Sequence, residues 1–264
     1  MALIEVRRLC VAERLDEVSF FLEAGEMLGV IGPNGSGKSS LLKSLAGILP
    51  ATGDIRFLDA PLAALSPEER ARRIGFLPQF CDSAWPLAVE DVVSLGRLPW
   101  RDRDEEAIQQ AIRETDIEPL RKKRIDCLSG GEQARVWLAR VLATRPRLIL
   151  ADEPIASLDL FYQAKIMRTL RRHADGEHGV IIALHDLALA AHHCDRLCLM
   201  RHGKIHAFGP PQKVLDESAL SEIFGVPIHV DLAHTPPIVL PDWDRGSGIR
   251  DQESEEANHA YTDH

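Results

Sequence analysis

Three short apolar runs alternate with helix-like segments along the chain. The runs are residues 26–31 (EMLGVI), 148–151 (LILA) and 180–184 (VIIAL), and each is followed by a polar turn. After the first run, the segment SSLLKSLAGIL repeats Leu and Ala at the spacing of an amphipathic helix. Strands that are apolar throughout and separated by helices indicate a parallel sheet covered on both faces. The pattern therefore predicts an α/β fold.

The remaining segments predict an insertion, a hairpin and a tail. Residues 82–145 contain prolines and a dense charge cluster without a strong strand pattern, which indicates a helical insertion in the core. The stretch RHGKIHAFG predicts a tight hairpin around Gly203, and PPQKVLDESALSEIF predicts one or two further helices. Residues 241–264 are acidic and polar, so we expect a disordered tail after a domain of residues 1–240.

Composition and charge exclude several classes of protein. The chain has 264 residues, 45% hydrophobic and 27% charged, which is enough for one large domain or two small ones. Its formal net charge of −9 argues against a nucleic-acid partner, because such proteins usually carry a basic patch. No apolar run approaches the roughly 18 to 20 residues of a membrane-spanning helix. Five scattered cysteines and a start without a long apolar run point to the cytoplasm and reduced thiols.

Residues 32–39 (GPNGSGKS) fit the phosphate-loop pattern GxxxxGK[ST], between an expected strand and an expected helix. Glycines let backbone N–H groups turn toward phosphates, and the N-terminus of the helix adds positive potential. Lys38 would reach the terminal phosphates and Ser39 would ligate Mg²⁺. An ordinary Gly-rich turn is the alternative, and the loop alone does not separate ATP from GTP. The expected phosphate contacts are Gly32, Pro33, Asn34, Gly35, Ser36, Gly37, Lys38, Ser39 and Ser40.

Two acids follow the second apolar run, at the edge of the sheet where ligands bind in open α/β folds. Asp152 would hold Mg²⁺, and Glu153 would act as the general base on an attacking water. A plain helix-capping role is the alternative for such acids. Together with the phosphate loop, the pair favours the metal-site interpretation.

Residues 128–133 (LSGGEQ) predict a helix start, because Ser129 and Glu132 have the spacing of a capping box. This helix start would also bind an anion, with the Ser129 hydroxyl and with amides of Gly130 and Gly131 that we expect to be open to solvent. One domain cannot use two phosphate-recognising loops on the same nucleotide if they lie on different lobes. A head-to-tail pair of domains can, so we expect an ATP-bound homodimer.

The order of these motifs along the chain resembles that of the ATP-binding subunit of ABC transporters, when Gln79, residues 157–159 (SLD) and His185 are included. The resemblance covers about residues 1–240. The resemblance implies a RecA-like phosphate-loop NTPase core with a parallel sheet, an N-terminal antiparallel β part and a helical insertion subdomain. It also implies ATP hydrolysis with Mg²⁺. Gln79 would sense Mg²⁺ or the attacking water, His185 would contact the γ-phosphate, and Asp159 would cross the dimer interface. Taken singly, each of these three is more often a surface or capping residue.

The resemblance assigns the site residues to three groups. The catalytic group is Glu153, His185, Gln79 and Lys38. The metal group is Ser39, Gln79 and Asp152. Besides the phosphate loop, the nucleotide contacts are Ser129, Gly130, Gly131, Glu132 and Asp159.

A narrower resemblance concerns residues 89–100 (VEDVVSLGRLPW) and the segment HGKIHAFGPPQKVL. Both are similar to the ATPases of importers for ferric siderophores, haem and cobalamin. This implies a subunit that closes as a dimer on ATP, reopens on hydrolysis and powers uptake of a metal chelate. It would be peripheral, at the cytoplasmic face of the inner or plasma membrane. An exporter ATPase and a soluble ABC-type ATPase without a transport role are the alternatives.

Membrane-spanning permease subunits are the expected partners, with a substrate-binding protein involved indirectly and no nucleic acid. We expect docking near Gln79 to Trp100, in a groove between core and insertion. The expected apolar anchors are Trp85, Leu87, Leu98 and Trp100. The chain departs from the family at residues 10–16, which contain no aromatic residue to stack on adenine. Arg14 could stack through its guanidinium plane instead, or it could be a solvated charge.

Two histidines and two cysteines lie close together in the sequence and could suggest a metal site. His192, His193, Cys194 and Cys198 are near one another in the sequence. We favour a packed helix that runs into a strand over a zinc site, because the surrounding residues are mostly apolar.

Overall fold

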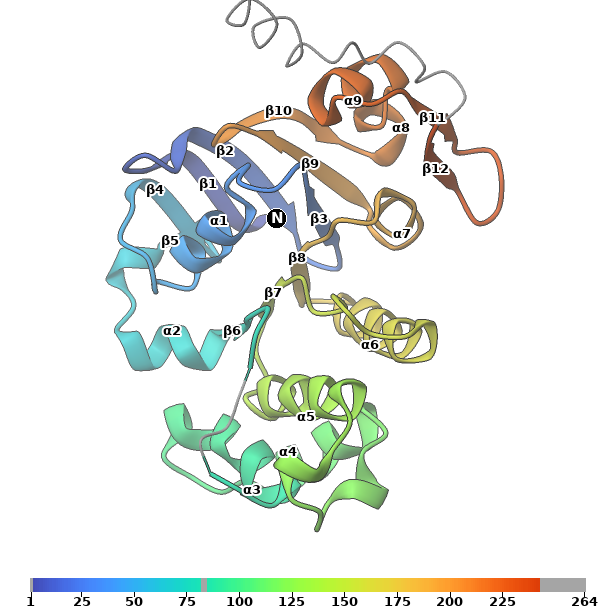
Figure 1. Cartoon of the computed structure of the whole chain (residues 1–264). Coiled ribbons are helices and arrows are strands. Elements are labelled where there is room, and N and C mark those ends of the chain that lie inside the picture. Colours follow the sequence, from blue (N-terminus) through green and yellow to red (C-terminus); the bar gives the residue numbers. More distant parts are fainter. Residues whose placement is uncertain (1, 82–84, 243–264) are drawn as a thin grey trace, which may run out of the picture.

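A six-stranded sheet lies at the centre of the structure, in the order β10-β9-β3-β8-β7-β6 (Figure 1). The strands from β9 to β6 are parallel, and β10 pairs antiparallel with β9. The computed structural model describes residues 2–81 and 85–242, so nearly all of the expected acidic tail lies outside the described residues. The strands are β3 (Met27–Ile31), β6 (Ile74–Leu77), β7 (Leu148–Asp152), β8 (Gly179–Ala183), β9 (Arg196–Arg201) and β10 (Lys204–Gly209).

The three apolar runs of the sequence form β3, β7 and β8, which confirms the expected parallel sheet. An antiparallel sheet with the order β2-β1-β4-β5 lies beside it, as the family resemblance implied. A separate hairpin, β11 with β12, was not expected from the sequence. These strands are β1 (Ala2–Val11), β2 (Leu15–Glu23), β4 (Thr52–Phe57), β5 (Ala60–Pro61), β11 (Ile228–Asp231) and β12 (Ile238–Pro241).

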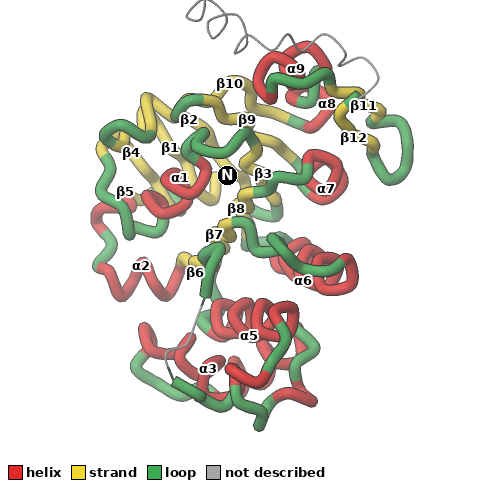
Figure 2. Tube along the Cα trace, in the orientation of Figure 1, coloured by secondary structure: helices red, strands yellow, loops and turns green. Residues whose placement is uncertain are grey.

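Helices connect the strands, and Figure 2 shows most of them around the central sheet and in one group below it. The α-helices are α1 (Lys38–Leu45), α2 (Pro67–Arg73), α3 (Val89–Ser94), α4 (Glu105–Glu114), α5 (Gly130–Ala143), α6 (Leu160–His173), α7 (Leu187–His193), α8 (Pro211–Val214) and α9 (Glu217–Phe224). The 3₁₀ helices are η1 (Leu62–Ala64), η2 (Leu95–Trp100), η3 (Glu118–Leu120) and η4 (Ile125–Cys127). None of the described helices is long and apolar enough to cross a bilayer.

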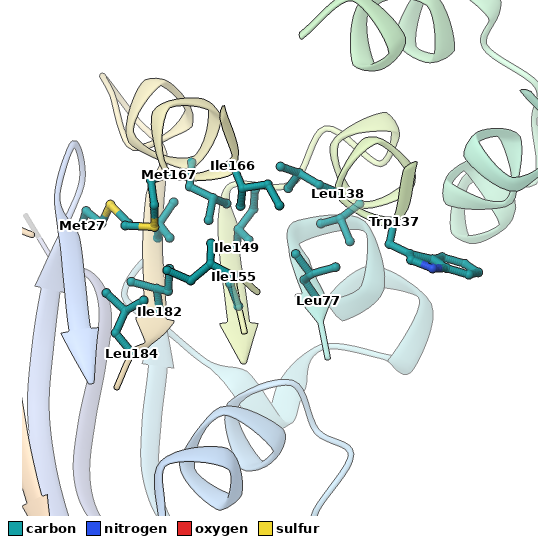
Figure 3. Packing of buried hydrophobic residues seen from close by; sticks show 14 of the residues in the cluster. Met27, Leu77, Trp137, Leu138, Ile149, Ile155, Ile166, Met167, Ile182 and Leu184 are labelled. Carbon is teal, nitrogen blue, oxygen red and sulfur yellow. The ribbon is translucent and has the colours of Figure 1, made fainter. Parts of the chain in front are cut away.

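Strands β3, β7 and β8 are buried on both faces of the central sheet, which explains why they are apolar without alternation. Along β7, Leu148 and Leu150 belong to the core shared with α1 and the antiparallel sheet. Ile149 and Ala151 belong to the core on the opposite face, where Ile166 and other residues of α6 pack (Figure 3). Because successive side chains of a strand point to opposite faces, residues 148–151 of β7 must all be apolar, and the polar Asp152 stands at the carboxyl end of the strand.

Helices α3 to α5 form the group below the sheet in Figure 1, within the segment where the sequence predicts an insertion. The GRLP stretch forms η2, and its Arg97 is buried against the end of α5. Arg97 Nη1 donates to the carbonyl oxygen of Ala143 at 3.0 Å, and Arg97 Nε donates to Asp102 Oδ1 at 2.8 Å. A paired and hydrogen-bonded guanidinium can be buried at this position without leaving a charge unsatisfied.

The group of histidines and cysteines near residue 192 is divided between a helix and a strand. His192 and His193 end α7, Cys194 follows the helix, and Cys198 lies in β9. This confirms the interpretation of a helix that runs into a strand. Both thiols are buried, and burial raises the pKa of Cys198 to about 12 and that of Cys194 further. Among the described residues, no group of three or more His, Cys, Asp or Glu side chains could hold a metal ion.

The turn between β9 and β10 docks on two other loops. The N–H of Gly203 donates to the carbonyl oxygen of Ser36 at 3.0 Å, and Asp16 N–H donates to the carbonyl oxygen of Gly203 at 3.0 Å. Gly203 has φ +75°, and a Cβ added there would lie 2.5 Å from the carbonyl oxygen of Arg14. The predicted hairpin therefore joins the phosphate loop to the β1–β2 turn, and only glycine fits at the contact.

The substitution Gly203→Ala tests this contact. Gly176→Ala is the matched control, because Gly176 has φ +59° but open space around its missing Cβ. Both variants bear the cost of a left-handed alanine, and only Gly203→Ala adds the overlap with Arg14. We expect Gly203→Ala to lower the free energy of unfolding by about 1–3 kcal/mol more than the control in urea titrations. Equal losses would contradict the docking.

A second prediction concerns His173, which is largely buried at the end of α6. Burial and the nearby His178 ring, 5.0 Å away between centroids, lower the pKa of His173 to about 4. In the unfolded chain this pKa is near its ordinary value of 6.5. The unfolded chain therefore binds more protons between these values, so stability falls as the pH drops from about 6.5 toward 4.

We expect His173→Gln to remove about 2–3 kcal/mol of this pH dependence. Urea midpoints of the two proteins, measured from pH 7 to pH 4.5, would show a flatter profile for the variant. His206→Gln, at an exposed position of β10, is the control and should keep the wild-type profile. A His173→Gln profile as steep as that of the wild type would contradict the prediction.

Candidate nucleotide site

A cavity of about 1020 Å³ opens above the phosphate loop. It is large enough for a nucleotide, and it lies at the carboxyl ends of the parallel strands, where open α/β sheets bind ligands. Its walls come from the β1–β2 turn, the phosphate loop, three strand ends and the β9–β10 turn. The lining residues are Cys10, Val11, Ala12, Glu13, Arg14, Leu15, Asp16, Asn34, Gly35, Ser36, Gly37, Lys38, Ser39, Ser40, Gln79, Glu153, His185, His202 and Gly203.

The glycines of the phosphate loop have conformations that other residues rarely adopt. Gly35 has φ +75°, and Gly37, the N-cap of α1, has φ +106°. Gly32 has φ +144°, and a Cβ there would lie 2.2 Å from the carbonyl oxygen of Met200. The loop therefore bends tightly at the N-terminus of α1, where the positive end of the helix dipole faces the cavity.

Lys38 is buried at the base of this loop. Its Nζ donates to the carbonyl oxygens of Gly32 at 2.9 Å and Pro33 at 3.2 Å. Burial lowers the pKa of Lys38, and the carboxylates of Glu153 and Asp152 oppose this effect. Lys38 also lines the cavity, at the wall formed by the phosphate loop.

Ser39 and Asp152 provide a pair of oxygen atoms suited to a hard cation. Ser39 Oγ donates to Asp152 Oδ1 at 2.9 Å. Asp152 is buried, and burial raises the pKa of its carboxyl, while the Ser39 hydrogen bond acts in the opposite direction. Hydroxyl and carboxylate oxygens are the ligand types that Mg²⁺ accepts in nucleotide sites. The donor set fits Mg²⁺.

Glu153 is held by groups from two neighbouring strand ends. Gln79 Nε2 donates to Glu153 Oε2 at 2.8 Å, and His185 Nε2 lies 2.5 Å from Glu153 Oε1. Lys38 Nζ is 4.0 Å from the same carboxylate. Gln79 follows β6, Glu153 follows β7 and His185 follows β8, and these three strands are adjacent. The structure thus brings together the four residues that the sequence nominated as catalytic.

The run of residues 128–133 starts α5 with the expected capping box. Ser129 N–H donates to Glu132 Oε2 at 2.9 Å, and Glu132 N–H donates to Ser129 Oγ at 3.3 Å. The first of these hydrogen bonds is the main reason why the pKa of Glu132 is lowered. The expectation of two open glycines is wrong for one of them. Gly130 is open, but Gly131 is buried beneath the ring of Tyr162, because α6 packs against this end of α5.

Neither the run 128–133 nor Asp159 lines the phosphate-loop cavity. Asp159 is the N-cap of α6, and its Oδ1 accepts a hydrogen bond from Tyr162 N–H at 3.0 Å. The structure therefore shows the capping role that the sequence left as the alternative for Asp159. The start of α1, which follows the phosphate loop, and the start of α5 lie at separate places within one chain.

A groove of about 290 Å³ lies between residues 77–81 and helix α5. The four expected anchors do not line it, and this corrects the interpretation of the sequence. Trp85 and Leu98 are exposed elsewhere, Leu87 packs against the core, and Trp100 Nε1 donates to the carbonyl oxygen of Thr144 at 3.0 Å. The aromatic residues that do line the groove are Phe80, which is 85% exposed, and Trp137.

His202 is a cavity residue that the sequence did not nominate. It lies in the β9–β10 turn and lines the same cavity as Arg14. The sequence predicted this turn but held no signal for its position, because only the packing of distant loops places it above the phosphate loop. Both side chains are exposed and carry planar groups that could stack on a nucleobase.

Comparison with known proteins agrees with this geometry. The family model described as ABC transporter matches residues 15–156. Hemin import ATP-binding protein HmuV of Streptomyces coelicolor is 45% identical over 222 residues, which cover 82% of this chain and 79% of that protein. HmuV of Pseudomonas entomophila is 42% identical over 228 residues, covering 83% and 89% of the two chains.

A solved structure has a similar fold over most of its length. It is an inward-facing conformation of an ABC transporter assigned to the metal-chelate type, with a TM-score of 0.80 and 25% identity. The match covers 92% of this chain and 98% of that chain. The chain therefore belongs to the ABC transporter family and carries its ATP-binding domain.

Proposed function

We propose that this chain is the ATP-hydrolysing subunit of an importer for a metal chelate of the hemin class. The observation that carries hydrolysis is the position of Glu153, held by Gln79 and His185 beside the buried Lys38. The relatives named for hemin import and the metal-chelate type of the similar structure support the cargo class.

The residues that line the cavity determine which way round a nucleotide binds in it. The triphosphate lies along residues 32–40, where the start of α1 and the Lys38 ammonium offset its charge. Ser39 and Asp152, with Gln79 as a further ligand, would hold Mg²⁺, which would supply positive charge against the phosphate oxygens. The nucleobase lies at the opposite end of the cavity, between the planar groups of Arg14 and His202.

Glu153 is the general base of the reaction. It accepts a proton from a water molecule whose oxygen attacks the γ-phosphorus, while the bond to the β–γ bridging oxygen breaks and ADP leaves. Gln79 and His185 each hold one oxygen of the carboxylate, which orients it toward the γ-phosphate. Lys38 stabilises the negative charge that develops on the transferred group.

A second copy of the chain completes the site. The signature run of residues 128–133 does not line its own cavity, and Gly130 is open to an approaching ligand. In a head-to-tail dimer, Ser129, Gly130, Gly131 and Glu132 of one copy face the nucleotide of the other, with Asp159 at the interface. Closure on ATP and reopening after hydrolysis then drive transport.

The groove beside Phe80 is the docking site for the membrane-spanning permease. Gln79 and Glu153 line both this groove and the nucleotide cavity, so a partner seated in the groove is next to residues of the catalytic site. The subunit is peripheral at the cytoplasmic face of the membrane. The substrate-binding protein acts through the permease and does not contact this chain.

The substitution Glu153→Gln tests the catalytic assignment. The amide cannot accept the proton, so we expect phosphate release to slow by about 10²–10⁴-fold while ATP binding persists. The variant should accumulate as a dimer with ATP and Mg²⁺ in light scattering. Glu177→Gln is the control and should keep the wild-type rate, because this exposed acid pairs with Arg147 at the amino ends of β7 and β8, opposite the cavity. A Glu153→Gln protein that stays monomeric at saturating ATP would count against the dimer.

Transport itself is tested with the complex purified from detergent-solubilised membranes. Recovery of a many-helix membrane protein supports the proposal, and recovery of ribosomes or nucleic acid contradicts it. The complex is then placed in vesicles with the ATPase outside and hemin inside. External ATP should release hemin from an importer, with the Glu153→Gln complex as the inactive control. Accumulation of external hemin inside the vesicles would identify an exporter.

A further inference from the structure

The ring of Tyr162 packs directly on the backbone of Gly131. A Cβ placed on Gly131 would lie 2.2 Å from Tyr162 Cδ2, 2.4 Å from Cγ and 2.7 Å from Cε2. Real Cβ atoms do not approach other heavy atoms so closely, so no other residue fits at 131 while the ring stays in place. Glycine is therefore required at position 131 by a contact within the same chain, the packing of the Tyr162 ring.

Arg135 holds the same ring one helical turn further along α5. Its guanidinium carbon is 5.1 Å from the ring centroid of Tyr162, and its Nη1 donates to the carbonyl oxygens of Thr115 at 3.1 Å and Asp116 at 2.6 Å. Arg135 is buried, and its Nε has no hydrogen-bond partner among the described residues. The ring is thus fixed between the start of α5 and a cation anchored to the loop after α4.

Tyr162 is also joined to the loop that precedes its own helix. Its backbone N–H donates to Asp159 Oδ1, which makes Asp159 the N-cap of α6. No hydrogen bond of the Tyr162 hydroxyl is found within the part of the chain that the structure describes. The ring, rather than the hydroxyl, therefore makes the connection to Gly131.

We propose that Tyr162 is a positioning residue, which sets the distance between the signature glycines and the Asp159 loop of the same chain. The inference rests on the proposed function, in which both segments face the nucleotide of a second copy. Tyr162 lines neither the nucleotide cavity nor the groove beside Phe80, so it acts on the site through its contacts with Gly131 and Asp159. Loss of the ring leaves the residues of both segments unchanged but alters the position of the signature glycines relative to the Asp159 loop.

The test compares Tyr162→Ala with Tyr162→Phe in the purified transporter complex. Tyr162→Ala should lower kcat for ATP by about tenfold or more, because small misplacements at a site have large effects on rate. Binding of a fluorescent ATP analogue to the isolated chain should change by less than about twofold, since that site lacks Tyr162. Tyr162→Phe keeps the ring, and its kcat should stay within about twofold of the wild type.

The outcomes separate this inference from the proposed function. An active wild-type complex with an equally active Tyr162→Ala variant would overturn the positioning role. A Tyr162→Phe variant as slow as Tyr162→Ala would also overturn it, because the hydroxyl would then matter. A wild-type complex that hydrolyses no ATP would refute the proposed function instead.

A second measurement does not depend on turnover. In thermal unfolding without nucleotide, Gly131→Ala should destabilise the wild type strongly, because its Cβ overlaps the Tyr162 ring. In the Tyr162→Ala background the overlap is gone, so the same Gly131→Ala substitution should lower Tm much less. Equal shifts in the two backgrounds would show that the ring does not pack on Gly131, and would overturn the inference even if Tyr162→Ala were too unstable for assays.

Discussion

Parallel pairing of β3, β8, β7 and β6 is the constraint on which the whole site depends. Parallel strands end at the same edge of a sheet, so four loops that are far apart in the sequence begin at one place. Those loops carry the phosphate loop, His185, the Asp152–Glu153 pair and Gln79. Without this pairing the Glu153 carboxylate would not meet Gln79 and His185, and the catalytic arrangement would not exist.

The contact region between the central sheet and helices α3 to α5, here called the seam, explains how the site could respond to a partner. Helix α5 takes part in both, since it packs on α3 and α4 and also contacts β6 and α6. Gln79 lies where this seam opens into the nucleotide cavity, and its amide already holds Glu153. A movement of the helical group that shifts residues 77–81 would therefore act on the catalytic carboxylate directly.

Close approach of backbones limits several positions to glycine, for reasons that differ from one to the next. Gly32 passes beneath a carbonyl of β9, Gly203 passes beneath the β1–β2 turn, and Gly131 lies under an aromatic ring. Each contact joins segments from different parts of the fold. Glycine at these positions is a requirement of packing between loops as well as of phosphate binding.

Local patterns in the sequence determined strands β3, β7 and β8 of the central sheet, the phosphate loop and the capping box at Ser129, because each depends on neighbours a few residues away. The same patterns nominated Lys38 and Glu153, whereas Gln79 and His185 were nominated by the family resemblance. Only the tertiary structure decided that Gly131 is covered by Tyr162, that Trp100 is tied to α5, and that His202 reaches the nucleotide cavity. These features depend on contacts between residues distant in the chain, and the periodicity of a sequence does not specify which distant segments meet.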